Sequence, residues 1–243
     1  MTSRRSGGTS TSTRVLVVDD HTVMRQGPIT LPATQPNLEV VGDVANGREA
    51  ILAADSTQLD VILMDLVMPG LNGLEATRQI RKDHPRTKVI MLTGFVVEDQ
   101  IVMALEAGAS GYVRKNTSIQ EFVITIRSTH GGNNFFSEDI NRQYDTAELV
   151  HRSQTNPQRT GLRVLTSRER KILQLVAEGL TNQELADELN ISIKTVETHK
   201  SHIMDKLQAR KRTDLIRIAL RYKLVNMESA EEATENLEQE NPD

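Results

Sequence analysis

Five short apolar runs alternate with helix-length amphipathic segments between Val15 and His130. Unbroken aliphatic runs are typical of strands that are buried on both faces. A strand–helix alternation of this kind predicts a doubly wound α/β domain, with a five-stranded parallel sheet of flavodoxin-like topology covered by helices on both sides. The expected strands contain Val15–Val18, Glu39–Val44, Val61–Met64, Lys88–Leu92 and Gly111–Val113, and the expected helices Gly47–Ala54, Gly73–Lys82, Glu98–Ala107 and Ser118–Arg127.

The first helix of this pattern contains two prolines. Thr22–Thr34 should form it, yet Pro28 and Pro32 lie inside the segment. An interior proline costs a helix about 3 kcal/mol. We therefore expect this helix to be kinked, shortened or partly unwound.

Acidic side chains follow two of the predicted strands. Asp19 and Asp20 come directly after the first strand, and Asp65 comes directly after the third. Ligands of an open parallel sheet bind at the carboxyl ends of its strands, so these carboxylates are expected to converge on one pocket. Their mutual repulsion favours a hard cation such as Mg²⁺ as cofactor. The alternative is that each aspartate only caps a strand-to-helix turn.

Three further side chains are expected at the same edge of the sheet. Thr93 ends the fourth strand, Lys115 follows the fifth, and Tyr112 lies within the fifth. An ammonium group and a hydroxyl suit a phosphoryl group carried on Asp65. Tyr112 could alternate between buried and exposed positions, or be an ordinary half-buried strand tyrosine.

From Thr166 onward the pattern is helical throughout. Thr166 and Thr181 each begin a capping-box sequence, and Ser192 is placed to cap a third helix. Two short helices joined by a tight turn predict a helix-turn-helix within an all-α, four-helix domain. The expected DNA-facing side of the third helix carries Lys194, Thr195, Glu197, Thr198, Lys200 and Ser201. The alternative is a small helical bundle that binds another protein.

Charge and composition divide the chain further. Residues 163–223 carry a net charge of +5, whereas the last twenty residues hold seven acids and no lysine or arginine. A basic module in an acidic chain is typical of DNA contact, although a solvated basic face is also possible. We expect a disordered arm at 1–13, an α/β domain at 14–131, a linker at 132–163 that could contain a helix over Asp139–Arg152, a helical domain at 164–226 and a disordered acidic tail at 227–243.

The chain has no cysteine, so it forms no disulfides and no thiolate metal sites. Its apolar runs are too short to cross a membrane, and the polar N-terminus does not resemble a signal peptide. We expect a soluble cytoplasmic protein without a membrane partner.

The segments VLVVDDH, DVILMDLVMPGLNGLEA, VIMLTGF and ALEAGASGYVRK resemble the signature segments of response-regulator receiver domains. The resemblance implies that Asp65 is the phosphoacceptor and that Thr93, Tyr112 and Lys115 form the switch. It also implies that Asp20, Asp65 and the backbone carbonyl of Val67 hold Mg²⁺, with Asp19 assisting through water.

The segment from Leu165 to Leu220 resembles the LuxR-type DNA-binding domain, most specifically in SIKTVETHKSHIMDKL. By that likeness Glu197, Thr198 and Ser201 contact bases, while Thr195 and Lys200 contact phosphates. The two domains in this order resemble the NarL/FixJ family of two-component response regulators. The family implies phosphorylation by a sensor histidine kinase, binding to a double-stranded DNA operator, a homodimer in the active state and no enzymatic turnover.

Three other functions are compatible with parts of the sequence. A phosphatase with an aspartyl nucleophile would need a general acid two residues past the nucleophile, which is absent. A transcription factor that senses a small molecule would need an apolar pocket in its N-terminal half. A phosphorylation-dependent module that binds proteins would need no DNA.

Overall fold

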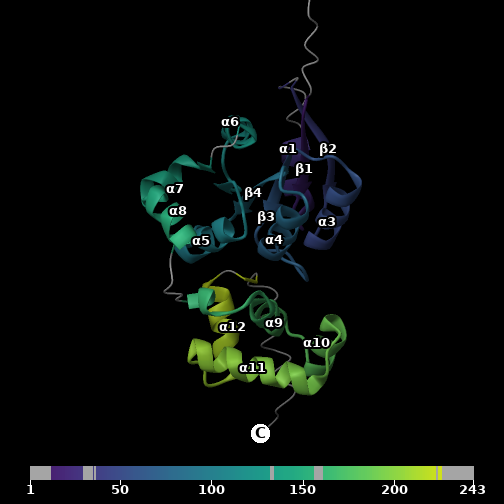
Figure 1. The fold of residues 1–243 in the computed structure, drawn as a ribbon, viewed down its shortest axis with the longest axis vertical. Helices are drawn as coiled ribbons and strands as arrows, with labels where there is room; N and C mark the ends of the chain where they lie inside the picture. The colour runs from purple at the N-terminus through teal and green to yellow at the C-terminus, as the bar shows by residue number, and fades with distance from the viewer. Residues whose placement is uncertain are drawn as a thin grey trace, which may run out of the picture.

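A parallel sheet forms the N-terminal half of the chain in the computed structural model (Figure 1). The structure describes residues 12–29, 35, 37–131, 134–155, 161–222 and 224–225, with only the backbone for 26–29. Among these residues the strand order is β2-β1-β3-β4-β5-β6, and every neighbouring pair is parallel. The strands are β1 (Thr13–Val18), β2 (Leu38–Val44), β3 (Val61–Asp65), β4 (Lys88–Thr93), β5 (Gly111–Arg114) and β6 (Phe135–Phe136).

Alternate residues of each central strand pack into two separate apolar layers. Val15 and Val17 of β1 pack with α6, whereas Leu16 and Val18 pack on the other face with α3, α4 and α5. Helices thus cover both faces, which explains why the strands read as unbroken apolar runs. The helices are α1 (Thr22–Ile29), α3 (Gly47–Ser56), α4 (Gly73–Asp83), α5 (Glu98–Glu106) and α6 (Ile119–His130). The doubly wound fold predicted from the sequence is confirmed.

The prediction of five strands was one short. The sixth strand, β6, is only two residues long and pairs with β5, with Phe135 opposite Gly111 and Phe136 opposite Tyr112. A two-residue strand within the polar sequence GGNNFFSED leaves no periodic signal, because a strand pattern needs several residues to appear.

The segment predicted as a linker is folded where it is described. The helix expected over Asp139–Arg152 is present as two helices, α7 (Glu138–Gln143) and α8 (Thr146–Thr155), and a 3-10 turn, η1, covers Gly161–Val164. Leu149 of α8 is buried against the apolar core, which attaches the segment to the sheet domain.

The first helix is described over eight residues, with Pro28 in its last turn. The residues expected to continue this helix, from Thr30 to Thr34, are outside the described part of the chain, so its expected length is not tested. Pro32 lies outside the described residues, as do residues 1–11 of the expected arm and the acidic tail after Val225.

Four helices form the C-terminal domain, and the predicted starts of the first three are confirmed. Capping boxes are present at Thr166 and Thr181, and the Ser192 side chain accepts from the Thr195 backbone N–H. Gly179, just past the first of these helices, has φ +94, which a side chain would strain. The helices are α9 (Ser167–Ala177), α10 (Asn182–Leu189), α11 (Ile193–Leu207) and α12 (Arg212–Arg221).

The two domains pack against each other. One apolar cluster continues from the sheet domain through Leu149 and Leu162 into the core of the helical domain. In Figure 1, α9 and α12 lie next to the sheet domain and α11 lies on the far side. Among the described residues, no helix is long and apolar enough to span a membrane.

Candidate functional site

The three predicted carboxylates meet at the carboxyl edge of the sheet. Asp65 is the last residue of β3, while Asp19 and Asp20 directly follow β1, its hydrogen-bonded neighbour in the sheet. Donor atoms of Asp19, Asp20, His21 and Asp65 all lie within 4.8 Å of one another. Carboxylate oxygens are the ligands that hard divalent cations prefer, so this cluster fits a metal ion chemically.

The position of Asp65 makes its ionised form costly. Burial raises the pKa of Asp65 from 3.8 to about 7; the charge of Lys115 opposes this rise, and the charges of Asp19 and Asp20 add to it. A bound cation or an added proton would relieve the same repulsion. Asp65 is therefore an acid whose charge state depends on what occupies the site.

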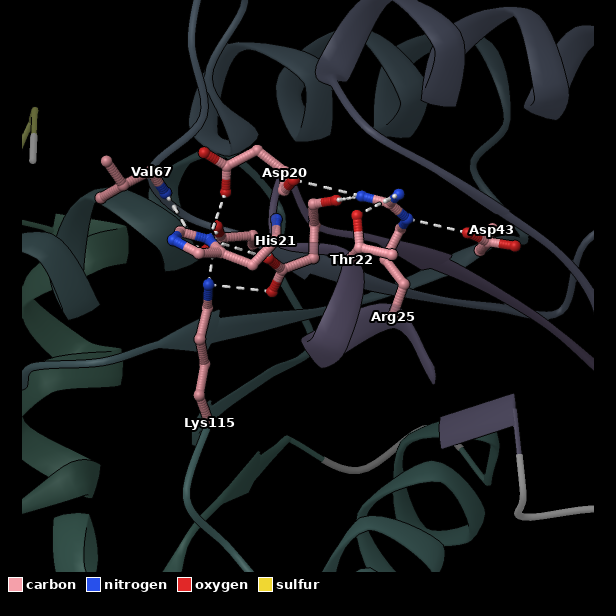
Figure 2. Close-up of polar contacts among 9 residues, drawn as sticks. Asp20, His21, Thr22, Arg25, Asp43, Val67 and Lys115 are labelled. Atoms are coloured by element: carbon pink, nitrogen blue, oxygen red, sulfur yellow. Dashed lines mark hydrogen bonds and ion pairs between the residues drawn. The ribbon is translucent and has the colours of Figure 1, made fainter. Parts of the chain in front are cut away.

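Lys115 bridges two of the acids (Figure 2). Its Nζ lies 2.8 Å from Asp19 Oδ2 and 2.8 Å from Asp65 Oδ2. Burial lowers the pKa of Lys115, but the charges of Asp65 and Asp19 outweigh burial and raise it above its usual value. Lys115 therefore remains a cation, placed beside Asp65, the carboxylate that the family resemblance implies to be the phosphoacceptor.

Two residues of the site were missed in the sequence. His21 Nδ1 lies 2.7 Å from Asp20 Oδ1, and the His21 backbone N–H donates to Asp19 Oδ1 at 2.9 Å. Arg25 of α1 donates to the backbone oxygen of Asp19 at 2.7 Å and pairs with Asp43 at 2.8 Å (Figure 2). The position of His21 directly after the two aspartates was the available signal, whereas nothing local indicated Arg25.

Thr93 and Tyr112 lie beside the acids but do not hydrogen bond to them. The Thr93 hydroxyl donates to the Phe95 backbone oxygen and accepts from the Phe95 N–H. Tyr112 is buried; burial raises the pKa of its hydroxyl, and the nearby Thr93 hydroxyl lowers it. Phe95, by contrast, is 61% exposed.

A cavity of about 310 Å³ opens beside these groups. Asp65, Thr93 and Lys115 line one part of it, while Leu220 of α12 and Val225 line another. The C-terminal domain therefore contributes apolar side chains directly to the space beside the predicted acceptor.

The predicted DNA-facing residues lie along one side of α11. The buried side is occupied by Val196 and Ile203. Lys200 is half-buried, and its Nζ donates to Asn182 Oδ1 at 2.9 Å. The exposed residues are Lys194, Thr195, Glu197, Thr198 and Ser201. The sheet domain does not cover this side, since α11 lies on the far side of the helical domain (Figure 1).

Polar contacts fix α9 against the sheet domain. Gln174 is fully buried; its Nε2 donates to the Met68 backbone oxygen at 2.9 Å, and its Oε1 accepts from Asn72 at 2.7 Å. Met68 and Asn72 belong to the loop that follows Asp65, so α9 rests on the loop that leads away from the acidic cluster.

Known proteins share both halves of this arrangement. The family model described as "Response regulator receiver domain" matches residues 15–127, and the one described as "Bacterial regulatory proteins, luxR family" matches residues 163–219. The response regulator protein VraR of Staphylococcus aureus is 40% identical over 217 residues, which covers 87% of this chain and 98% of VraR.

Solved structures agree with this result. A two-component response regulator of the LuxR family from Aurantimonas sp. SI85-9A1 is 33% identical with a TM-score of 0.52, and the match covers 59% of this chain and 99% of that chain. RcsB of Salmonella typhimurium matches with a TM-score of 0.63, and the match covers 89% of this chain and 100% of the RcsB chain. At 22% sequence identity, this match shows a similar fold. The chain belongs to the family of response regulators that join a receiver domain to a LuxR-type DNA-binding domain.

Proposed function

We propose that Asp65 accepts a phosphoryl group from a sensor histidine kinase and that its phosphorylation controls binding to DNA. The observation that carries this proposal is the buried Asp65 carboxylate, in contact with Lys115 and beside Asp19 and Asp20. A carboxylate oxygen of Asp65 attacks phosphorus, the P–N bond of the donor phosphohistidine breaks, and the imidazole leaves with the bonding electrons. Lys115 pairs with the phosphoryl oxygens, because its ammonium group already lies 2.8 Å from Asp65 Oδ2.

Asp19, Asp20, Asp65 and the backbone carbonyl of Val67 would hold Mg²⁺ in this site. The carboxylate donors suit this ion, and Val67 lines the same cavity as Asp65. When bound, Mg²⁺ neutralises charge on the phosphoryl oxygens. The chain's own residues position the nucleophile, and the phosphoryl group stays on Asp65, so the receiver acts as a regulator and not as a turnover enzyme.

Thr93 and Tyr112 would report the phosphorylation. The Thr93 hydroxyl has to give up its hydrogen bond to Phe95 to reach a phosphoryl oxygen on Asp65. This moves the loop that carries exposed Phe95, next to the cavity that Leu220 and Val225 of the helical domain line. Added charge beside these apolar side chains disfavours the packed arrangement, so the modification biases an existing equilibrium.

The DNA-binding half would read a double-stranded operator with α11. Glu197, Thr198 and Ser201 contact base edges, while Lys194, Thr195 and Lys200 contact phosphates. One small basic domain makes few phosphate contacts, so the active form is a homodimer on two half-sites. RcsB has been solved as dimers bound to DNA.

The proposed domain boundaries are 14–131 for the receiver and 164–226 for the DNA-binding domain, joined by residues 132–163. The arm at 1–13 and the tail at 227–243 lie outside both. Because the proposed partner is genomic DNA of a bacterial cell, the protein is placed in the cytoplasm.

Labelling by radioactive acetyl phosphate tests the proposal. We expect labelling of the wild type and of Asp83→Asn, whose side chain is exposed, and none of Asp65→Asn. Labelling should also stop when a chelator removes divalent cations. Normal labelling of Asp65→Asn would show that the acceptor lies elsewhere.

A further inference from the structure

A second cavity lies where the receiver, the linker helices and the DNA-binding domain meet. Its volume is about 620 Å³, and its lining is mainly polar. The receiver contributes Arg78 and Glu106, α8 contributes Ser153, Gln154 and Thr155, η1 contributes Arg163, and the helical domain contributes residues at the start of α9. This cavity is separate from the acidic cluster, because the two share no lining residue.

Three guanidinium groups gather around the second cavity. Arg78, Arg163 and Arg170 line it, and Glu106 is the single acid among its described lining residues. Glu75 lies outside the lining but pairs with Arg78 at 2.6 Å. With both glutamates counted, the cluster keeps one positive charge.

Arg163 has donors that the protein does not use. Its side chain is only 1% exposed, and Nη2 pairs with Glu106 at 2.6 Å. Its Nε and Nη1 are buried and have no hydrogen-bond partner among the described residues. Asp99 lies within electrostatic range of Arg163, but its carboxylate bonds to Tyr222 and it does not line the cavity. Unmet guanidinium donors in a buried position are costly, so they indicate an absent acceptor.

The other two arginines meet at one hydroxyl. Ser167 Oγ accepts from Arg78 Nη1 at 3.0 Å and from Arg170 Nη2 at 3.3 Å. Thr166 and Ser167 are the N-cap and first residue of α9, an eleven-residue helix whose N-terminal dipole adds partial positive charge. Two like charges beside a helix N-terminus favour an anion with several oxygens.

We propose that this junction cavity binds a small phosphate-bearing anion of the pyrophosphate type. The fixed fork geometry of arginine matches phosphate oxygens, and Arg163 supplies two donors for them. No aromatic residue is among the described lining residues, so recognition rests on the phosphate groups and not on a nucleobase. Because the anion would touch both domains, binding it stabilises their packed arrangement.

Calorimetry with inorganic pyrophosphate tests the proposal on the full chain. The buffer contains a chelator and no Mg²⁺, so that pyrophosphate cannot bind through a metal at the acidic cluster. We expect saturable binding that is at least tenfold tighter than that of malonate, together with a rise in the thermal unfolding midpoint. Absence of binding, or equal binding of malonate, would overturn the proposal.

Three variants locate the binding. Arg163→Gln and Arg78→Gln are each expected to weaken pyrophosphate binding at least tenfold. Arg142→Gln removes the same charge from an exposed position on α7 and is expected to leave binding unchanged. If Arg163→Gln does not fold, Arg78→Gln decides, because its side chain is 31% exposed. Equal weakening in Arg142→Gln would show general charge attraction and refute the site.

Discussion

Replacing Asp65 by asparagine is expected to stabilise the metal-free protein against unfolding at alkaline pH. Burial and the neighbouring acids raise the pKa of Asp65 from 3.8 to about 7 in the folded protein. The folded protein therefore binds this proton more tightly than the unfolded chain does. Asparagine keeps the shape of the side chain and removes the charge.

The magnitude follows from the pKa difference. Each tenfold change in proton affinity corresponds to about 1.4 kcal/mol, so the rise from 3.8 to about 7 corresponds to roughly 4 kcal/mol. Below pH 3.8 the aspartate is protonated in both the folded and the unfolded state, so it does not lower the free energy of unfolding. Between pH 3.8 and about 7 the unfolded chain ionises first, so the free energy of unfolding falls as pH rises. Above about pH 7 the aspartate is ionised in both states, and the free energy of unfolding is lower than in acid by the full amount of roughly 4 kcal/mol.

Urea unfolding in a chelator at several pH values measures this difference. We expect Asp65→Asn to exceed the wild type by several kcal/mol at alkaline pH and by much less in acid. Asp83→Asn is the matched control, because it removes an exposed carboxylate, and it should show no such pH dependence. A wild type as stable as Asp65→Asn under alkaline conditions would refute the electrostatic account of the site.

Three further outcomes are expected. Gln174→Ala removes the two buried hydrogen bonds between α9 and the loop after β3. The contact between the domains should therefore weaken by about 1–3 kcal/mol, and amide exchange at this contact should become faster. Gln183→Ala, at an exposed position of α10, should change neither quantity. Lys194→Ala should weaken binding to all DNA sequences and reduce the slope of log K against log salt concentration by about 1. Glu197→Ala should instead reduce the preference for one base at one operator position by about 1–3 kcal/mol. If a binding-enrichment experiment showed that Glu197→Ala affects all sequences equally, contact of Glu197 with a base would be contradicted. Thr181→Ala removes the N-cap of α10 and should lower the free energy of unfolding by about 1 kcal/mol in urea titrations, a loss that a serine at this position should largely avoid.

The central strands and the acidic cluster were predictable because their signals are local. Each strand of the buried sheet is a continuous apolar run, and parallel strands necessarily bring their carboxyl ends to one edge. Asp19 and Asp65 therefore meet as the sequence indicates, and the hydrogen bond that the Ser192 side chain accepts from the Thr195 backbone N–H follows from the capping position of Ser192. These features need only chain order and periodicity.

What the sequence did not reveal depends on packing between distant segments. The two-residue strand β6 exists because Phe135 and Phe136 meet the edge of β5, not because of any repeat in their own segment. The buried contact of Gln174 with Asn72 joins residues 102 positions apart, and glutamine on a helix reads as a surface residue. Arg163 likewise reads as a solvated linker charge, yet it is almost fully buried.

Identifying the residue that carries phosphate after reaction with acetyl phosphate tests most directly whether Asp65 is the phosphoacceptor. Reduction with borohydride converts an aspartyl phosphate to homoserine, which peptide mass spectrometry locates in the chain. We expect homoserine at position 65 and at no other aspartate. Homoserine at Asp19 or Asp20, or phosphate on a serine or histidine alone, would contradict it.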